Sequence, residues 1–459
     1  MMEWGELRSK VLERIKPEPD EEAEIRALRE IVCRRLSVHL KENGVEASVE
    51  TQGSVVHGTW LRGEHDLDIF IVLTPSFGRE NLPKVLDVVK TFTGPGWVEA
   101  YAEHPYIKAD ISGLSVDFVP CFKVEDGKLI SSTDRTPLHT EYLKTRLNSE
   151  KCDEVRLLKR FLRGVGVYGA EIKVGGFSGY VAELLVLAYG SFIGVLEAAA
   201  VWKKNVFVPV VKLEKRRFGD PLIVVDPVDL TRNASSAVSE TSMWNFVAAA
   251  QRFLEKPSER FFFPPTVEGS KEDLLTLLDR RSLDTLFLVI DDPKPDVPDI
   301  LWGQLKKTEK NLGRHLREKG FQVIRTDAWS DEKFRHIIVL ELESARLPAV
   351  VKQVGPPVSM AEDGERFKKL YTSAATTVAG PGVEGDRWWV TVKRQTPEAV
   401  TCLRRSFSEG GAELGIPRKF SEDIRKATIL TNSEVAEHLE GDFKNHLHRF
   451  ISGRPAWLD

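Results

Sequence analysis

The sequence contains little cysteine, and the cysteines present form no recognisable pattern. Of 459 residues, only four are cysteines. No two of them have a Cys-x-x-Cys spacing, so neither a zinc site nor a disulfide framework is expected. A reducing, cytoplasmic setting fits this composition best. The four are Cys33, Cys121, Cys152 and Cys402.

An excess of positive charge is also absent. The formal net charge is −4, so any nucleic-acid partner must be held by local basic patches. The first residues lack a basic region followed by an apolar one, and no signal peptide is expected. The longest apolar run, residues 181–202, carries Glu183 and Glu197. It is therefore predicted to be one buried core helix rather than a membrane span, and no membrane partner is expected.

A strand with two carboxylates at its start is predicted at residues 67–73. The segment is apolar and β-branched apart from Asp68. Asp66 stands two residues before Asp68 in the sequence. Alternate strand residues share a face, so both carboxylates point the same way. Two anions side by side repel each other, and a cation between them relieves the repulsion. Mg²⁺ is the natural candidate for oxygen ligands, although an isolated Asp-x-Asp pair is most often a solvated strand end.

A phosphate-binding turn is predicted just before this strand. Gly53 allows the backbone a close approach, and Ser54 adds a hydroxyl. The following residues can open a helix whose free N–H groups would face an anion such as a triphosphate. A Gly-Ser pair alone is an ordinary turn. Its position before the carboxylate strand favours a nucleotide site.

A third carboxylate stands in another apolar segment. Extended segments are expected at residues 97–101, 106–111 and 115–119, with a turn at Gly113. If the last segment pairs beside the first carboxylate strand, Asp117 completes a three-carboxylate cluster. Otherwise Asp117 is an ordinary aspartate at the edge of a sheet.

These residues resemble a known catalytic signature. Gly53-Ser54, Asp66-x-Asp68 and Asp117 are similar to the signature of the nucleotidyltransferase superfamily that contains DNA polymerase β and poly(A) polymerases. Six further motifs, in order, resemble the archaeal, class I, CCA-adding enzymes. They are AEHPY at 102–106, DRTP at 134–137, VRLLK at 155–159, YGAE at 168–171, GFSGY at 176–180 and VDPVD at 225–229.

The resemblance implies a role for each candidate residue. Asp66, Asp68 and Asp117 would be the catalytic residues and would hold two Mg²⁺ ions, with Asp117 nearest the attacking hydroxyl. The nucleotide would be bound by Gly53, Ser54, His57, His139, Lys159 and Tyr168. The base would be recognised by Glu103, His104 and Arg232.

Two of these positions depart from the family pattern. His57 stands where the family has an Arg that touches the triphosphate, so this contact is weaker or pH-dependent. Asp66 stands where Glu is common, and it remains a hard oxygen ligand. Two other positions have structural alternatives. The helical spacing of residues 150–164 leaves Lys159 free to project from a face other than the apolar one, where it could also be an ordinary solvated lysine. Arg232 could instead form a structural ion pair with Asp229.

Beyond residues 261–265 the pattern changes to strands alternating with helices, which predicts a separate α+β region. Two segments suit RNA: the basic cluster at residues 212–217 and the aromatic and basic residues at 387–394. A solvated turn and an ordinary core strand explain them about as well. The predicted strands lie at 286–290, 321–325 and 336–342, with a helix at 301–319.

The predicted fold is therefore an α+β multidomain protein. A polymerase β-like nucleotidyltransferase domain with a mixed sheet is expected at residues 1–145. A helical nucleotide- and RNA-binding domain follows at 146–260, and an α+β region that binds tRNA occupies 261–459. The resemblance leaves a homodimer open.

The resemblance implies template-independent addition of C, C and A to the 3′ end of tRNA from CTP and ATP, with pyrophosphate release and repair of damaged ends. The tRNA acceptor arm would be the partner. A poly(A) polymerase or another small-substrate nucleotidyltransferase would share the carboxylates but need only one nucleotide. A non-catalytic RNA-binding protein would be expected to have lost at least one of them.

Overall fold

The structure is a computed structural model that describes residues 4–64, 66–101, 105–125, 127–211, 218–265, 270–408 and 414–458. The chain divides into two compact units. Unit 1 comprises Met1–Thr266 together with Pro455–Asp459, and unit 2 comprises Val267–Arg454. The predicted boundary at residue 145 lies inside unit 1 and stays a prediction.

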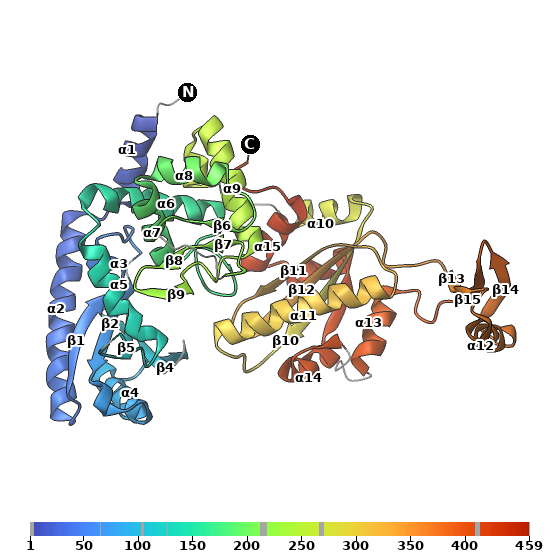
Figure 1. Ribbon diagram of the computed structural model, residues 1–459, viewed down its shortest axis with the longest axis horizontal. Helices are drawn as coiled ribbons and strands as arrows, with labels where there is room; N and C mark the ends of the chain where they lie inside the picture. The colour runs from blue at the N-terminus through green and yellow to red at the C-terminus, as the bar shows by residue number, and fades with distance from the viewer. Residues whose placement is uncertain are drawn as a thin grey trace. The chain divides into compact units, whose positions relative to one another are not determined.

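Unit 1 begins with a five-stranded mixed sheet in the order β1-β2-β5-β4-β3. Strands β2 (Asp66–Leu73) and β5 (Leu114–Phe122) run parallel, and the other neighbours run antiparallel. Helices α2 (Pro19–Glu42) and α4 (Leu82–Thr93) pack against this sheet through one shared apolar core (Figure 1). The remaining strands are β1 (Ala47–Gln52), β3 (Val98–Tyr101) and β4 (Pro105–Ile111).

The pleat of the sheet decides which side chains face away from α2 and α4. In β2, Leu67 and Ile69 belong to the core shared with these helices. Asp66 and Asp68 alternate with them and so occupy the opposite face. The same alternation in β5 places Asp117 on that opposite face. The covered face of the sheet therefore holds the fold together, and the other face carries the carboxylates.

The second part of unit 1 is a helical layer around an aromatic core. The ring of Phe161 lies 5.7 Å from that of Phe261 in a stacked arrangement, and other phenylalanines meet it edge-on. The ring of Trp457 also stacks on the ring of Phe261, at 5.5 Å. The helices are α1 (Trp4–Ile15), α6 (Ser149–Val165), α7 (Gly179–Tyr189), α8 (Phe192–Ala200) and α9 (Glu240–Glu255).

The prediction of one helix over residues 181–202 is wrong. The segment forms α7 and α8, which are bent by 88° relative to each other. Gly190 ends α7 with a φ of 86°, and the Ser191 hydroxyl accepts a hydrogen bond from the Gly194 N–H at the start of α8. Among the described residues, no single helix meets the length and hydropathy expected of a membrane span, and only this bent pair does so when joined.

Unit 2 is built on a four-stranded antiparallel sheet in the order β11-β12-β10-β16. One apolar core joins it to α11, α13 and α14, and a second core joins it to α10 and α15. The strands are β10 (Asp284–Asp291), β11 (Val323–Ser330), β12 (Arg335–Leu342) and β16 (Thr428–Thr431). The helices are α10 (Lys271–Arg280), α11 (Pro298–Glu318), α13 (Ala399–Ser408), α14 (Arg418–Lys426) and α15 (Gly441–Ser452).

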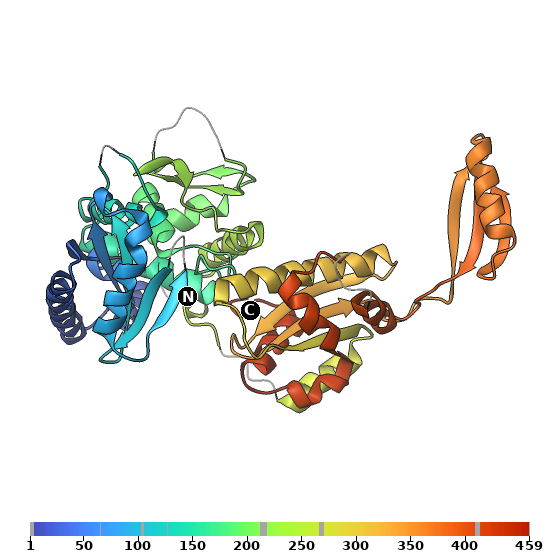
Figure 2. The ribbon, with the colours of Figure 1, turned by 90° about the horizontal axis from the view of Figure 1, so that it is seen from below.

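A small satellite stands apart from the four-stranded sheet within unit 2 (Figure 2). It consists of a three-stranded sheet in the order β13-β15-β14 and helix α12 (Ala361–Thr372). Gly364 and Gly382 face the rings of Trp388 and Trp389, where an added Cβ would lie about 3 Å from ring atoms. Both tryptophans therefore contribute to packing within the satellite. The strands are β13 (Val350–Pro357), β14 (Thr377–Glu384) and β15 (Arg387–Lys393).

Candidate active site

The predicted carboxylates come together on neighbouring strands. Asp68 of β2 and Asp117 of β5 are direct register partners in the parallel pair, and Asp66 is opposite Ser115. Burial, followed by the charges of Asp117 and Asp66, raises the pKa of Asp68 from 3.8 to about 7. Burial also raises the pKa of Asp117. The fold thus holds anions near one another at a cost in electrostatic energy, which is the arrangement that a cation would relieve.

A lysine lies beside this cluster. Lys108 of β4 is the register partner of Asp117, and its Nζ lies 3.6 Å from Asp117 Oδ1. Within the part of the chain that the structure describes, Asp117 Oδ1 is nevertheless buried without a hydrogen-bond partner. Among the described residues, no three His, Cys, Asp or Glu side chains already converge as metal ligands. The shared face, the raised pKa values and the unpartnered oxygen fit a divalent cation once the side chains turn towards it.

The close approach of Asp68 restricts position 53 to glycine. Its φ is 76°, in the left-handed region, and a Cβ built at this position would lie 2.1 Å from Asp68 Oδ2. Only glycine combines this backbone conformation with this approach. Gly53 leads directly into Ser54, the first residue of the short helix α3 (Ser54–His57). The phosphate-binding turn and the carboxylate strand predicted from the sequence are therefore in direct contact.

Lys159 is buried, so the alternative of an ordinary solvated lysine is wrong. Its side chain is only 3% exposed, and its Nζ lies 2.9 Å from Thr59 Oγ1 and 3.4 Å from the carboxylate of Glu183. The ion pair with Glu183 explains why a lysine can be buried here. An added Cβ at Gly179 would lie 3.1 Å from the Tyr168 hydroxyl and 3.5 Å from Lys159 Nζ. Lys159 and Tyr168 thus both lie next to Gly179, the first residue of α7.

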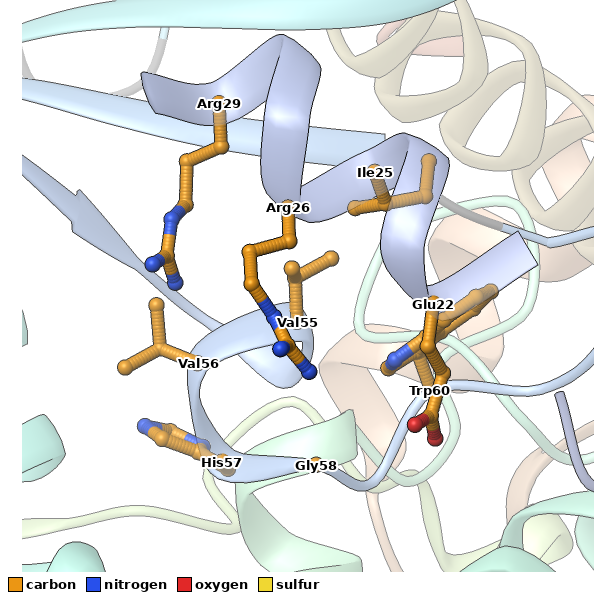
Figure 3. Close-up of a pocket in the computed structure, with 9 residues that line it drawn as sticks. All are labelled: Glu22, Ile25, Arg26, Arg29, Val55, Val56, His57, Gly58 and Trp60. Carbon is orange, nitrogen blue, oxygen red and sulfur yellow. The ribbon is translucent and has the colours of Figure 1, made fainter. Parts of the chain in front are cut away.

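His57 contacts the same carboxylate. Its Nδ1 lies 3.2 Å from Glu183 Oε1, and its Nε2 lies 3.1 Å from the Thr140 hydroxyl on α5 (Arg135–Lys144). On the other side of α3, His57 lines a cavity of about 230 Å³. Figure 3 shows Arg26 and Arg29 reaching from α2 towards this cavity. The His57 side chain is therefore anchored inside the protein.

A second buried carboxylate contacts Arg232, one of the base-recognition candidates, and His139, one of the nucleotide-binding candidates. Asp226, in the two-residue strand β8 (Val225–Asp226), is fully buried. His139 Nε2 lies 2.9 Å from it, Arg232 Nη1 donates to it at 2.8 Å, and the Tyr180 hydroxyl donates at 3.1 Å. The ring of His139 also stacks on Tyr180 at 4.0 Å. Burial opposes ionisation of Asp226, but these partners lower its pKa to about 2.

Arg232 forms an ion pair, although not the one suggested by the sequence. Its partner is Asp226, whereas Asp229 accepts a hydrogen bond from Arg135 at 2.8 Å. The Arg232 side chain remains 37% exposed. Its guanidinium is therefore held by Asp226, and the side chain is still partly open to solvent. The other two base-recognition candidates, Glu103 and His104, lie outside the described residues.

Sequence reasoning did not assign a role to Glu183 or Thr59. Thr59 is fully buried beside both Lys159 and Glu183. The available signal was the single carboxylate of α7, a helix whose other side chains carry no charge. A charge in such a helix needs a buried partner, and that partner could have been sought among the nucleotide candidates.

The chain matches three described protein families. Residues 25–139 match the nucleotidyltransferase domain, and residues 153–263 match the second domain of tRNA nucleotidyltransferases. Residues 284–432 match the C-terminal domain of CCA-adding enzymes. The three matches follow one another along the chain.

Similar proteins over nearly the whole length are named CCA-adding enzymes. One from Pyrobaculum neutrophilum is 40% identical over 440 residues, which cover 94% of this chain and 100% of that protein. One from Methanothermobacter thermautotrophicus is 38% identical and covers 97% of each chain. A solved structure of the Cid1 poly(U) polymerase with bound 3′-dATP has a TM-score of 0.44 at 18% identity, over 55% of this chain and 94% of that one, and this likeness carries no further conclusion.

Proposed function

The chain belongs to the CCA-adding enzymes, and from this premise we propose that it adds C, C and A to the 3′ end of tRNA from CTP and ATP without a template. The observation that carries the proposal for the site is the register pairing of Asp68 with Asp117 on the face of the sheet away from α2 and α4. A tRNA that has lost its last one or two nucleotides is an intermediate of the same reaction. Repair of damaged ends therefore belongs to the proposal.

In the proposed reaction, the 3′-hydroxyl of tRNA attacks the α-phosphorus of the nucleotide and pyrophosphate leaves. Two Mg²⁺ ions bound by Asp66, Asp68 and Asp117 would supply a more acidic attacking hydroxyl and neutralise the triphosphate. Gly53 keeps the backbone against Asp68, where any Cβ would collide with the carboxylate. Of the three carboxylates, we assign Asp117 to the position nearest the attacking hydroxyl.

The remaining candidates are assigned to the triphosphate. Lys159 and Tyr168 both lie next to Gly179 at the N-terminus of α7, where helix N–H groups favour an anion. The ammonium of Lys159 and the hydroxyl of Tyr168 can both donate hydrogen bonds to phosphate oxygens. His57, Ser54 and His139 complete this set. Ser54 and His57 lie on α3, and His139 lies on α5.

Base selection is assigned to Arg232. Cytosine and adenine both present an amine beside an unprotonated ring nitrogen, whereas uracil and guanine present a carbonyl beside an N–H. A guanidinium held by Asp226 can donate to the ring nitrogen of the first pair, but it faces another donor in the second pair. Glu103 and His104 remain candidates for the same edge of the base.

The tRNA is assigned partly to unit 2, where shape rather than base sequence would be recognised. On the satellite, Lys352 and Lys368 lie 5.2 Å and 5.1 Å from the rings of Trp389 and Trp388. Lysines beside aromatic rings suit a nucleic-acid backbone. The satellite also exposes Val354, Leu370, Val378 and Val383. A homodimer through such side chains belongs to the proposal, as does a cytoplasmic location.

One assay tests the proposal. Purified protein is mixed with Mg²⁺ and one labelled nucleotide at a time, using tRNAs that end before the first C, after the first C or after both. We expect CTP to be incorporated into the first two tRNAs and ATP into the third. Repeated incorporation of ATP into all three tRNAs would instead indicate a poly(A) polymerase.

A further inference from the structure

Glu183 is a buried carboxylate in a helix that otherwise lacks charged side chains. It lies in the middle of α7 and is 2% exposed. A carboxylate withdrawn from water is strongly destabilising unless charged or hydrogen-bonding groups surround it. The packing of an apolar helix does not require one at this position. The partners of Glu183 therefore indicate its purpose.

Those partners come from separate parts of unit 1. Lys159 Nζ of α6 lies 3.4 Å from Glu183 Oε1, His57 Nδ1 of α3 lies 3.2 Å from the same oxygen, and the Thr59 hydroxyl donates to it. Thr140 of α5 holds the far side of the His57 ring. Burial disfavours ionisation, but Lys159 and the other partners lower the pKa of Glu183 to about 2. The carboxylate stays ionised across the working pH range.

We propose that Glu183 is the positioning residue of the triphosphate site, because one fixed carboxylate holds both Lys159 of α6 and His57 of α3. This inference rests on the proposed function, in which both residues bind the nucleotide. A lysine carries its charge on a flexible stem with a large rotamer entropy. Pairing with Glu183 removes that freedom before the nucleotide arrives. The entropy of ordering the ammonium is then not lost on binding.

The three donors of Lys159 are all engaged, so a ligand would be bound by exchange of one contact. An ammonium has three N–H donors, and Lys159 Nζ lies within hydrogen-bonding distance of both oxygens of Thr59 and of Glu183. Exchange of one of these contacts for a phosphate oxygen would keep the others. Glu183 thereby acts through Lys159 rather than by touching the nucleotide.

The test replaces Glu183 by Gln, which keeps the shape of the side chain and removes its charge. The matched control is Glu197→Gln, because Glu197 lies on the neighbouring helix α8 and is exposed. Steady-state addition of C to tRNA gives KM for CTP, KM for tRNA and kcat. Equilibrium dialysis with CTP and Mg²⁺, in the absence of tRNA, gives nucleotide affinity independently of turnover.

We expect Glu183→Gln to raise KM and the dissociation constant for CTP about tenfold or more, with a smaller change in kcat, because binding through Lys159 is lost. KM for tRNA and every parameter of Glu197→Gln should stay within about twofold of the wild type. In a double-mutant cycle with Lys159→Met, the two effects on CTP affinity should be far from additive. Glu183→Asp keeps the charge but moves it away from Lys159 by one methylene. Its CTP affinity should lie between that of Glu183→Gln and that of the wild type.

Three outcomes would overturn the inference: unchanged CTP affinity in folded Glu183→Gln, additive effects in the cycle, or a loss of thermal stability alone. If Glu183→Gln does not fold, the comparison uses two other proteins. One is Glu183→Asp, and the other is the double variant Glu183→Met with Lys159→Met, which removes both charges. A wild-type chain that binds CTP but transfers nothing to tRNA would refute the proposed function. In that case the dialysis series would still decide the role of Glu183.

Discussion

Replacing Asp68 by Asn should make the metal-free protein more stable while abolishing its activity. In the folded protein, burial and the neighbouring carboxylates raise the pKa of Asp68 from 3.8 to about 7. In the unfolded chain, the same carboxyl loses its proton near pH 3.8. Between these values the folded state must keep a proton that the unfolded state releases. The free energy of unfolding therefore falls as pH rises through this window.

The size of the effect follows from the two pKa values. A change from 3.8 to about 7 corresponds to about 4 kcal/mol when both states are fully titrated. Asn keeps the shape of the side chain and carries no charge, so it removes this cost. We expect the free energy of unfolding of Asp68→Asn to exceed that of the wild type by up to about 4 kcal/mol at pH 8, and by less than about 2 kcal/mol at pH 5.

The assay is urea unfolding in EDTA at several pH values. The matched control is Asp87→Asn on α4, where the side chain is 74% exposed and no change beyond about 0.5 kcal/mol is expected. Adding Mg²⁺ should stabilise the wild type and leave Asp68→Asn almost unchanged, because binding to the folded state alone raises stability. An Asp68→Asn protein that is no more stable than the wild type at pH 8, or that still transfers nucleotides at a normal rate, would refute the reasoning.

Four further predictions address other parts of the chain. Gly53→Ala should lower kcat about a hundredfold or more in steady-state assays, because its Cβ would displace the Asp68 carboxylate; near-normal kcat would contradict the contact. Arg232→Ala should reduce incorporation of CTP and ATP and narrow the CTP-to-UTP ratio by about tenfold or more; an unmoved ratio with a lower melting temperature would make Arg232 structural. Affinity for tRNA, measured by filter binding, should fall steeply between about 50 and 200 mM salt; a flat dependence would exclude backbone contacts by basic patches. Trp457→Ala should cost about 3–5 kcal/mol in urea unfolding, because the side chain is buried against Phe261; a loss below about 1 kcal/mol would contradict that packing.

Local patterns in the sequence predicted the catalytic sheet well. The apolar run at residues 67–73 predicted a strand, and β2 occupies Asp66–Leu73. The suggestion that the strand carrying Asp117 pairs beside it is confirmed by the parallel β2–β5 pair. Alternation of apolar and polar side chains is a property of neighbouring residues, so it can be read without knowing the fold. The family and the mixed α and β architecture are also confirmed.

Long-range charge pairs were the part that the sequence did not reveal. Lys159 and Glu183 are 24 residues apart, and Glu183 is 126 residues from His57. No local spacing links such residues, so Lys159 looked like a solvated side chain. Arg232 was given the wrong acidic partner for a similar reason, since Asp226 and Asp229 are equally plausible until the backbone course of β8 and β9 (Asp229–Asn233) is known.

The single helix expected at residues 181–202 was wrong because composition outweighed a local break. The segment remains apolar on both sides of Gly190 and Ser191, so hydropathy alone continues through the bend. A glycine followed by a serine is nevertheless a typical helix end followed by a helix start. That local signal was available in the sequence and predicts the observed division into α7 and α8.

We propose that this chain builds CCA ends with Asp66, Asp68 and Asp117. The most direct measurement incubates tRNA lacking its last three nucleotides with all four nucleoside triphosphates and Mg²⁺, and then sequences the 3′ ends. The wild type should yield ends that stop at CCA, and Asp117→Asn, which preserves shape but removes the charge, should leave the tRNA unextended. Ends of another sequence, or CCA ends formed equally well by Asp117→Asn, would contradict the account.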